Sequence, residues 1–213
     1  MSDRSIAESG TSTGRGVADM TRCYGGRPSG VHRYRTGVTS PEPIAAALPE
    51  RVLVVMAHPD DVDFSAAGSI AQWTAAGSRV TYCIITDGDA GGFDPSVPRS
   101  EIGAIRRSEQ SAAAARIGVT DLVFLGYPDG RLQATLELRR DLSRVIRTVR
   151  PQRVVCQSPE RNYSRIYASH PDHLAAAEAA LCAVYPDARN PFAYPELVAE
   201  GLDAWTVNEV WLS

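Results

Sequence analysis

The chain contains no lysine, because all 22 of its basic residues are arginine. This absence excludes a Walker-A phosphate loop, a Schiff-base lysine and a lysine general base. The sequence also has no dense run of basic residues, and its net charge is −3 at pH 7. These features argue against nucleic acid or an anionic membrane surface as the main partner.

Cysteine is scarce, and long apolar runs are missing. The four cysteines show no CxxC spacing, and Cys83 and Cys156 lie inside apolar segments. We therefore expect reduced structural thiols rather than a disulfide framework or a cysteine zinc site. No apolar stretch approaches the roughly 20 residues of a membrane span, and the N-terminus lacks the apolar core of a secretory signal. The expected location is the cytoplasm.

Composition indicates a single domain that follows a tail. Hydrophobic residues make up 44% of the chain and charged residues 22%, as is usual for soluble globular proteins. Residues 1–49 are rich in Gly, Ser, Thr, Arg and Pro and show little apolar periodicity. This pattern predicts a flexible tail, or alternatively an arm that binds a partner or a second copy of the chain. We expect residues 50–213 to form the domain.

Strand-sized apolar segments alternate with helical patterns along this domain. Strands are predicted at 51–56, 79–86, 121–125, 153–157 and 206–212, and helices at 64–76, 98–118, 136–149 and 172–184. The alternation predicts an α/β fold, namely a Rossmann-like three-layer α/β/α sandwich with a mostly parallel sheet. Ser100 and Asp172 are the expected caps of the second and fourth helices. Right-handed crossovers bring the loops after the first, second and fourth strands to one edge of the sheet.

Three of the four histidines fall in two short motifs that follow predicted strands, HPDD at 58–61 and HPDH at 170–173. Catalytic zinc takes three protein ligands from His, Asp or Glu and keeps a fourth position for water. Two histidines and one carboxylate of these motifs meet that need, and the remaining carboxylate and histidine supply a base and an acid. The alternative for each aspartate taken singly is a helix cap.

The motifs resemble those of the PIG-L (LmbE-like) zinc-dependent de-N-acetylase family. The resemblance rests on AHPDD at 57–61, TDGDAGG at 86–92, Arg106 with Glu109 in a predicted helix, and HPDH at 170–173. It implies a hydrolase that removes an N-acetyl or other acyl group from an N-acetylglucosamine-type conjugate. A small N-acetylated amino sugar is therefore the expected partner.

The resemblance also implies the roles of individual residues. Zinc, or another divalent transition metal, is expected on His58, Asp61 and His173. Asp60 matches the general base of the family. His170 matches the residue that, when protonated, stabilises the oxyanion and can act as an acid.

Arg106 matches an arginine that contacts substrate in related enzymes, and Asp87 and Asp63 are further candidates for substrate binding. The chain departs from the family pattern at two places. Val62 and Asp63 follow AHPDD where Glu is common, so Asp63 either supports the site or caps a helix. Ala168 stands where some members have a tyrosine that holds the tetrahedral intermediate.

Two other functions stay open at this point. The first is a metal-binding member without turnover that serves as a binding module, suggested by Ala168 and the tail. The second is a nucleotide-dependent Rossmann enzyme, although GDAGGFD at 88–94 lacks the GxGxxG spacing that brings a pyrophosphate to a helix N-terminus. A homo-oligomer is compatible with the sequence.

Overall fold

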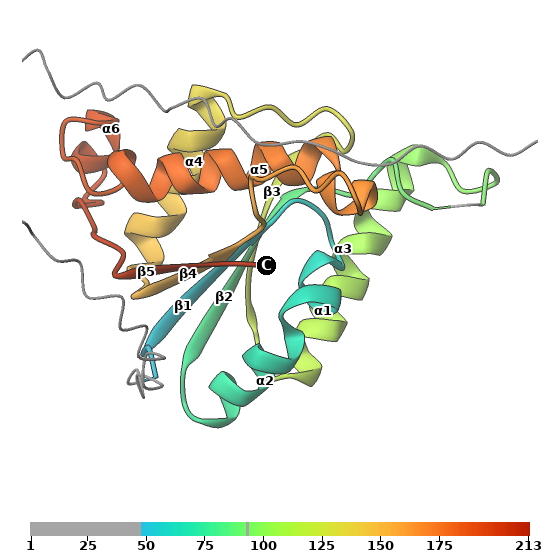
Figure 1. Ribbon diagram of the computed structural model, residues 1–213, viewed down its shortest axis with the longest axis horizontal. Coiled ribbons are helices and arrows are strands. Elements are labelled where there is room, and N and C mark those ends of the chain that lie inside the picture. Colours follow the sequence, from blue (N-terminus) through green and yellow to red (C-terminus); the bar gives the residue numbers. More distant parts are fainter. Residues whose placement is uncertain (1–47, 93) are drawn as a thin grey trace, which may run out of the picture. The chain divides into compact units, whose positions relative to one another are not determined.

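A computed structural model of the protein describes residues 48–92 and 94–213. The predicted tail, 1–49, lies almost entirely outside these residues, so its flexibility stays a prediction. The described residues form a five-stranded sheet with helices on both faces (Figure 1). All strand pairs in this sheet are parallel. The predicted three-layer α/β sandwich is therefore confirmed.

The sheet has the strand order β3-β2-β1-β4-β5. Its strands are β1 (Arg51–Met56), β2 (Arg79–Thr86), β3 (Asp121–Tyr127), β4 (Arg153–Cys156) and β5 (Glu209–Leu212). The central strands β1 and β2 are almost completely buried, which explains why their apolar residues do not alternate with polar ones. The strand β5 lies at an edge of the sheet.

Helices cover the two faces of the sheet separately. They are α1 (Asp61–Ser65), α2 (Ala67–Ala75), α3 (Arg99–Arg116), α4 (Leu136–Val149), α5 (Pro171–Cys182) and α6 (Pro195–Ala199), with short helical turns at Ile166–Ser169 and Ala183–Asp187. One core lies between the sheet and α1 to α3, and the other between the sheet and α4 and α5 (Figure 1). The strand β1 contributes to both, with Val52 and Val54 in the first core and Leu53 and Val55 in the second.

The predicted start of the first helix was wrong. The helix begins at Asp61 rather than at residue 64, because Asp60 takes up a left-handed conformation with φ 90° and serves as the N-cap. The backbone of Ala66, with φ −132°, then separates α1 from α2. Asp61 consequently lies in the first turn of α1, shortly after the end of β1 in the chain.

Two predicted caps were also wrong, in each case because a neighbouring residue takes the N-cap position. Pro98 occupies the N-cap of α3, so Ser100 lies within the first turn. In α5, His170 is the N-cap and Pro171 the first helical residue, a position that proline favours because its missing N–H has no helical partner there. Asp172 is left free to point away from the helix end.

The strand order reverses beside β1. The chain runs from β1 outward to β2 and β3, and then returns to β4 on the other side of β1. In open parallel sheets, ligands bind in the crevice at the carboxyl ends of the strands where the order reverses. The HPDD motif follows β1 and the HPDH motif follows β4, so both lie at this reversal point.

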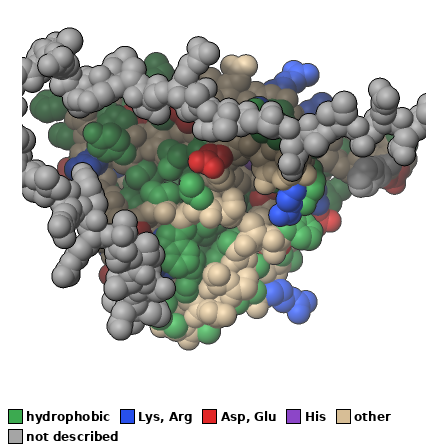
Figure 2. All heavy atoms as spheres, viewed as in Figure 1, with side chains coloured by type: hydrophobic (Ala, Val, Ile, Leu, Met, Phe, Trp, Pro, Cys, Tyr) green, Lys and Arg blue, Asp and Glu red, His purple; other side chains and the backbone are tan. Residues whose placement is uncertain are grey.

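Two surface features bear on the partners expected from the sequence. Among the residues that the structure describes, no helix is long and apolar enough to cross a membrane. On the described part of the face shown in Figure 2, arginine side chains are scattered and form no continuous basic patch.

Candidate active site

The loop after β1 and the first turn of α5 bring three donor groups together. His58 Nδ1 lies 3.2 Å from His173 Nε2 and 3.3 Å from one carboxylate oxygen of Asp61. His173 Nε2 lies 3.1 Å from the other oxygen of Asp61. Neighbouring ligands at about 2.1 Å from one metal ion are about 3.0–3.4 Å apart. The spacing of these donors, and their chemistry of two imidazoles and a carboxylate, therefore fit a single divalent ion.

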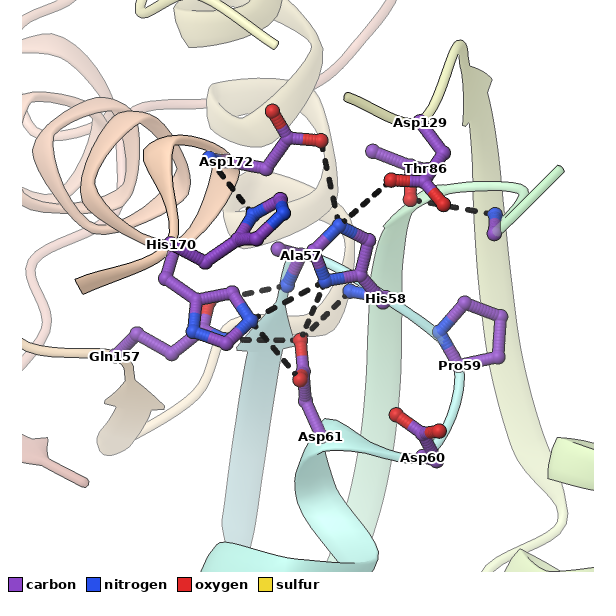
Figure 3. Close-up of polar contacts among 12 residues, drawn as sticks. Ala57, His58, Pro59, Asp60, Asp61, Thr86, Asp129, Gln157, His170 and Asp172 are labelled. Carbon is purple, nitrogen blue, oxygen red and sulfur yellow. Dashed lines mark hydrogen bonds and ion pairs between the residues drawn. The ribbon is translucent and has the colours of Figure 1, made fainter. Parts of the chain in front are cut away.

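The second ring nitrogen of His58 faces two carboxylates on the side away from Asp61 (Figure 3). Nε2 lies 3.0 Å from Asp129 and 3.3 Å from Asp172. Histidines that ligate a metal usually donate their other N–H to a carboxylate, which fixes the ring. These carboxylates also form a group with His58 in which all ligand atoms lie within 4.8 Å. Because they contact Nε2, they orient the ring while Nδ1 stays available.

The carboxylate of Asp172 also accepts hydrogen bonds from the loop after β3. Its side chain is only 1% exposed, and it accepts hydrogen bonds from the backbone N–H groups of Gly130 at 2.7 Å and Leu132 at 3.1 Å. The residue thus joins the start of α5 to the loop after β3. This is a tertiary role in place of the predicted helix cap.

Asp61 is held by donors from both sides of the strand reversal. The backbone N–H of His58 donates to its carboxylate at 2.8 Å, and Gln157 Nε2 donates at 2.9 Å. Gln157 follows β4, and its side-chain oxygen Oε1 accepts a hydrogen bond from the backbone N–H of Ala57 at 3.1 Å. The side-chain amide of Gln157 therefore fixes the Asp61 carboxylate relative to both strands.

The charges of this cluster shift its pKa values. Burial lowers the pKa of His58, but the nearby carboxylates of Asp61, Asp129 and Asp172 outweigh burial and raise it to about 9. Burial likewise raises the pKa of Asp61, yet hydrogen bonds with His173 and His58 outweigh it and hold the pKa well below its usual value. The negative charge of several nearby carboxylates favours a cation at this place. A bound metal ion would compensate this charge as a proton on His58 does.

Asp60 lies next to these donors and is held by α3. Its carboxylate is 2.5 Å from Arg106, and its backbone N–H donates to Gln110 Oε1 at 2.6 Å. Arg106 also donates to the carbonyl oxygen of Pro59 at 2.9 Å. A left-handed conformation costs a non-glycine residue on the order of 1 kcal/mol. The buried Gln110 and the Arg106 guanidinium stabilise Asp60 in this conformation.

His170 stands edge-on to His58, with ring centroids 4.9 Å apart. Its Nδ1 accepts a hydrogen bond from the backbone N–H of Asp172 at 3.2 Å, so this nitrogen carries no proton. Burial, followed by the positive charge of His58, lowers the pKa of His170. The hydrogen bond leaves Nε2 as the nitrogen that carries a proton, and the protonated ring that the resemblance implies stays a prediction.

Two cavities adjoin the donor cluster. The smaller, of about 380 Å³, is lined by Asp60, Arg106 and His170 together with His58 and His173. The larger, of about 720 Å³, is lined on its inner side by Asp61 and His173. Both include Tyr167 in their walls.

Of the three predicted substrate residues, only Arg106 lines the cavity that contains Asp60 and His170. Asp87 accepts a hydrogen bond from Arg107 at 2.6 Å and lines a separate cavity of about 250 Å³. Asp63 accepts one from Gln110 at 3.3 Å, and burial raises its pKa. Asp63 lines neither of the two cavities beside the donors.

Three supporting residues were missed by sequence reasoning, namely Asp129, Gln157 and Gln110. Asp129 carried a usable signal, because it lies in a Pro-Asp-Gly segment that follows the third strand at the same edge of the sheet as the histidine motifs. That segment is also typical of a turn, and a turn accounts for Asp129 without any contact with His58. The two glutamines lie next to β4 and within α3 and carried no comparable signal.

Comparison with known proteins gives consistent matches. Residues 53–184 match the PIG-L family, described as GlcNAc-PI de-N-acetylase. A probable N-acetyl-alpha-D-glucosaminyl L-malate deacetylase 2 from Bacillus anthracis is 33% identical over 160 residues, which cover 72% of this chain and 68% of that protein. A diacetylchitobiose deacetylase from Thermococcus kodakarensis is 32% identical over 161 residues, covering 76% of this chain and 58% of the relative.

A solved structure agrees with these matches. The N,N'-diacetylchitobiose deacetylase from Pyrococcus horikoshii aligns with a TM-score of 0.70 and 31% sequence identity, covering 74% of this chain and 57% of the other. The chain thus spans about three fifths to two thirds of the length of the relatives it matches.

Proposed function

Because the chain belongs to the PIG-L family of GlcNAc-PI de-N-acetylases, we propose that it hydrolyses the N-acyl amide of an N-acetylglucosamine-type conjugate. The observation that carries the proposal is the close spacing of donor atoms from His58, Asp61 and His173. These donors lie beside a cavity that Asp60 and His170 also line. The three donors for an ion and the two acid–base groups therefore lie close together.

The ion in this proposal is zinc, held by His58 Nδ1, His173 Nε2 and the Asp61 carboxylate. When bound, zinc supplies Lewis acidity and lowers the pKa of a water molecule to about 7. Asp129 and Asp172 keep the His58 ring oriented, and Gln157 keeps the Asp61 carboxylate oriented. Such outer partners typically raise metal affinity by 10- to 100-fold.

The chain's own residues then move the protons. Asp60 accepts a proton from the attacking water as its oxygen adds to the carbonyl carbon. His170 donates a hydrogen bond from its Nε2–H to the negative oxygen that forms and keeps this proton. Asp60, now protonated, delivers its proton to the amide nitrogen as the C–N bond breaks. The products are a carboxylate and a free amino sugar.

The smaller cavity is the proposed sugar site. Its wall combines Arg106 and Asp129 with Gly88, Ala90 and Gly91, so it offers charged groups to sugar hydroxyls. Its volume of about 380 Å³ lies in the usual range for small-molecule pockets, roughly 300–1,000 Å³. The names of the relatives describe enzymes for N-acetylglucosaminyl malate and diacetylchitobiose, which makes these compounds the first substrates to test.

The test is release of a primary amine from a panel of N-acetylglucosamine conjugates by the zinc-loaded protein. At least one conjugate should be hydrolysed. Asp60→Asn should retain one zinc per chain but lose at least about 100-fold in turnover, the lower range for a general base. The matched control is Asp203→Asn, since Asp203 is exposed and distant in sequence from both motifs.

Two results would contradict the proposal. Comparable turnover by Asp60→Asn would remove Asp60 from its role as the base. A protein that binds zinc stoichiometrically yet releases no amine from any conjugate would instead be a metal-binding module.

A further inference from the structure

The larger cavity has an unusual outer wall. Phe64, Tyr163 and Tyr167 line it, and these residues are 88%, 83% and 69% exposed. The rest of the wall, which includes Asp61 and His173, is mostly polar. Aromatic rings in a pocket wall offer apolar surface to a ligand, so we expect part of the ligand of this cavity to be apolar.

The positions of the acid–base groups show which part of the substrate lies in each cavity. The leaving nitrogen must lie close to the group that protonates it. Asp60 and His170 line the smaller cavity, and neither lines the larger one. The amine half of the amide, which is the sugar, therefore belongs in the smaller cavity.

The acyl half then extends in the other direction. His173 and Tyr167 line both cavities, so the two are neighbours across the reacting position. Beyond the carbonyl carbon, an acetyl substrate has only a methyl group, which is about the size of a water molecule with its share of roughly 30 Å³. The cavity of about 720 Å³ is far larger than that.

Small side chains help to keep this cavity open. Ala168 lies in the helical turn before HPDH and contributes to the wall, as does Ser65 at the end of α1. A bulky side chain at position 168 would fill part of the space beside His173. The cavity is thus matched to a group longer than acetyl.

We infer that this cavity binds the acyl chain of the substrate and that the protein removes acyl groups larger than acetyl, such as a medium-length aliphatic or arylacetyl group. The inference rests on the proposed amide hydrolysis. It adds the class of acyl group and names Phe64, Tyr163 and Ala168 as residues that determine specificity.

The experiment compares N-acetyl-, N-butyryl-, N-hexanoyl- and N-phenylacetylglucosamine as substrates of the zinc-loaded protein, with primary amine release as the signal. Each methylene buried in an apolar site raises kcat/KM by about fourfold when it is fully used. We expect kcat/KM for the N-hexanoyl compound to exceed that for N-acetylglucosamine by at least tenfold.

Two variants test the wall directly. Ala168→Phe fills the cavity, and Phe64→Ala removes an apolar surface, so each should lower the hexanoyl-to-acetyl ratio of kcat/KM by about tenfold. Phe192→Ala is the matched control, because Phe192 is 89% exposed and lines neither cavity. This control should leave the ratio unchanged.

A binding measurement gives a readout that does not depend on turnover. In the Asp60→Asn background, calorimetry should show tighter binding of N-hexanoylglucosamine than of N-acetylglucosamine, and Ala168→Phe should remove the difference. A preference for N-acetyl compounds that neither wall variant alters would overturn the inference and leave the proposed function intact. Hydrolysis of no amide in either panel would instead refute the proposed function, and the inference with it.

Discussion

Asp172 shows how much of the site depends on a single buried carboxylate. It accepts two backbone N–H groups from the loop after β3 and faces His58 Nε2. A buried carboxylate is stable only when hydrogen bonds or opposite charges compensate its lost hydration. The same contacts therefore stabilise the fold and orient a proposed metal ligand.

Asp172→Ala should lower both stability and metal affinity. The change leaves the N–H groups of Gly130 and Leu132 without their acceptor, which should reduce the free energy of unfolding by about 3 kcal/mol. Zinc affinity should fall by about 10- to 100-fold, because the His58 ring loses one of the carboxylates that orient it. Urea denaturation of the metal-free protein and zinc titration against a competing chelator measure the two effects.

The control for this variant is Glu178→Ala, an exposed position on the same helix, which should change the free energy of unfolding by less than about 0.5 kcal/mol. Asp172→Asn retains one acceptor oxygen and should fall between the two. Equal stability of Asp172→Ala and the control would mean that the carboxylate contributes nothing to the loop after β3.

A metal site was expected from the sequence, whereas the residues that support the proposed donors were not. The expectation rested on two histidine and aspartate motifs that follow predicted strands, and the choice of His58, Asp61 and His173 came from the family resemblance. Asp129 and Asp172 each have an adequate local explanation, a turn and a helix cap. Their actual contacts join segments that are distant in sequence, and local patterns contain no information about such pairs.

The secondary-structure predictions also differ in accuracy, because the interiors of helices and strands were easier to predict than their ends. The bounds of β1, β2 and α4 agree with those predicted, because continuous burial and apolar periodicity extend over their full lengths. The starts of α1, α3 and α5 differ, because each depends on the backbone conformation of one residue. Asp60, Pro98 and His170 take those positions, and only Asp60 belongs to the residue types generally preferred at a cap.

Helix α4 permits a matched test of the core on the face opposite α1 to α3. Leu142 is fully buried, whereas Leu136, in the same helix, is 68% exposed. Leu142→Ala should lower the free energy of unfolding by about 2–5 kcal/mol, because it removes buried methyl groups and leaves a cavity. Leu136→Ala should change it by less than about 0.5 kcal/mol. Chemical denaturation measures both, and similar losses would show that α4 does not pack on the sheet through Leu142.

For the whole molecule, the proposed ion should act as a stabilising ligand. It would bind the folded chain and not the unfolded one, so zinc at 100 times its dissociation constant should add about 2.7 kcal/mol to the free energy of unfolding. Thermal denaturation should show a higher Tm with zinc and a return to the starting value with a chelator.

His173→Ala supplies the comparison for this thermal shift. Without one of the three donors, the variant should show little or no zinc-dependent change in Tm while keeping its helical circular dichroism signal. A full zinc response in this variant would place the ion elsewhere. The metal-free wild type should remain folded, because neither apolar core includes any of the three donors.

The facing nitrogens of His58 and His173 belong to residues 115 positions apart in the chain. They meet only after β4 has paired with β1, and that pairing requires the chain to have passed over the sheet and returned. An ion held between them would link the loop after β1 to the start of α5, and would do so only once the sheet has formed. Zinc binding would therefore report the fraction of chains in which these two segments have come together.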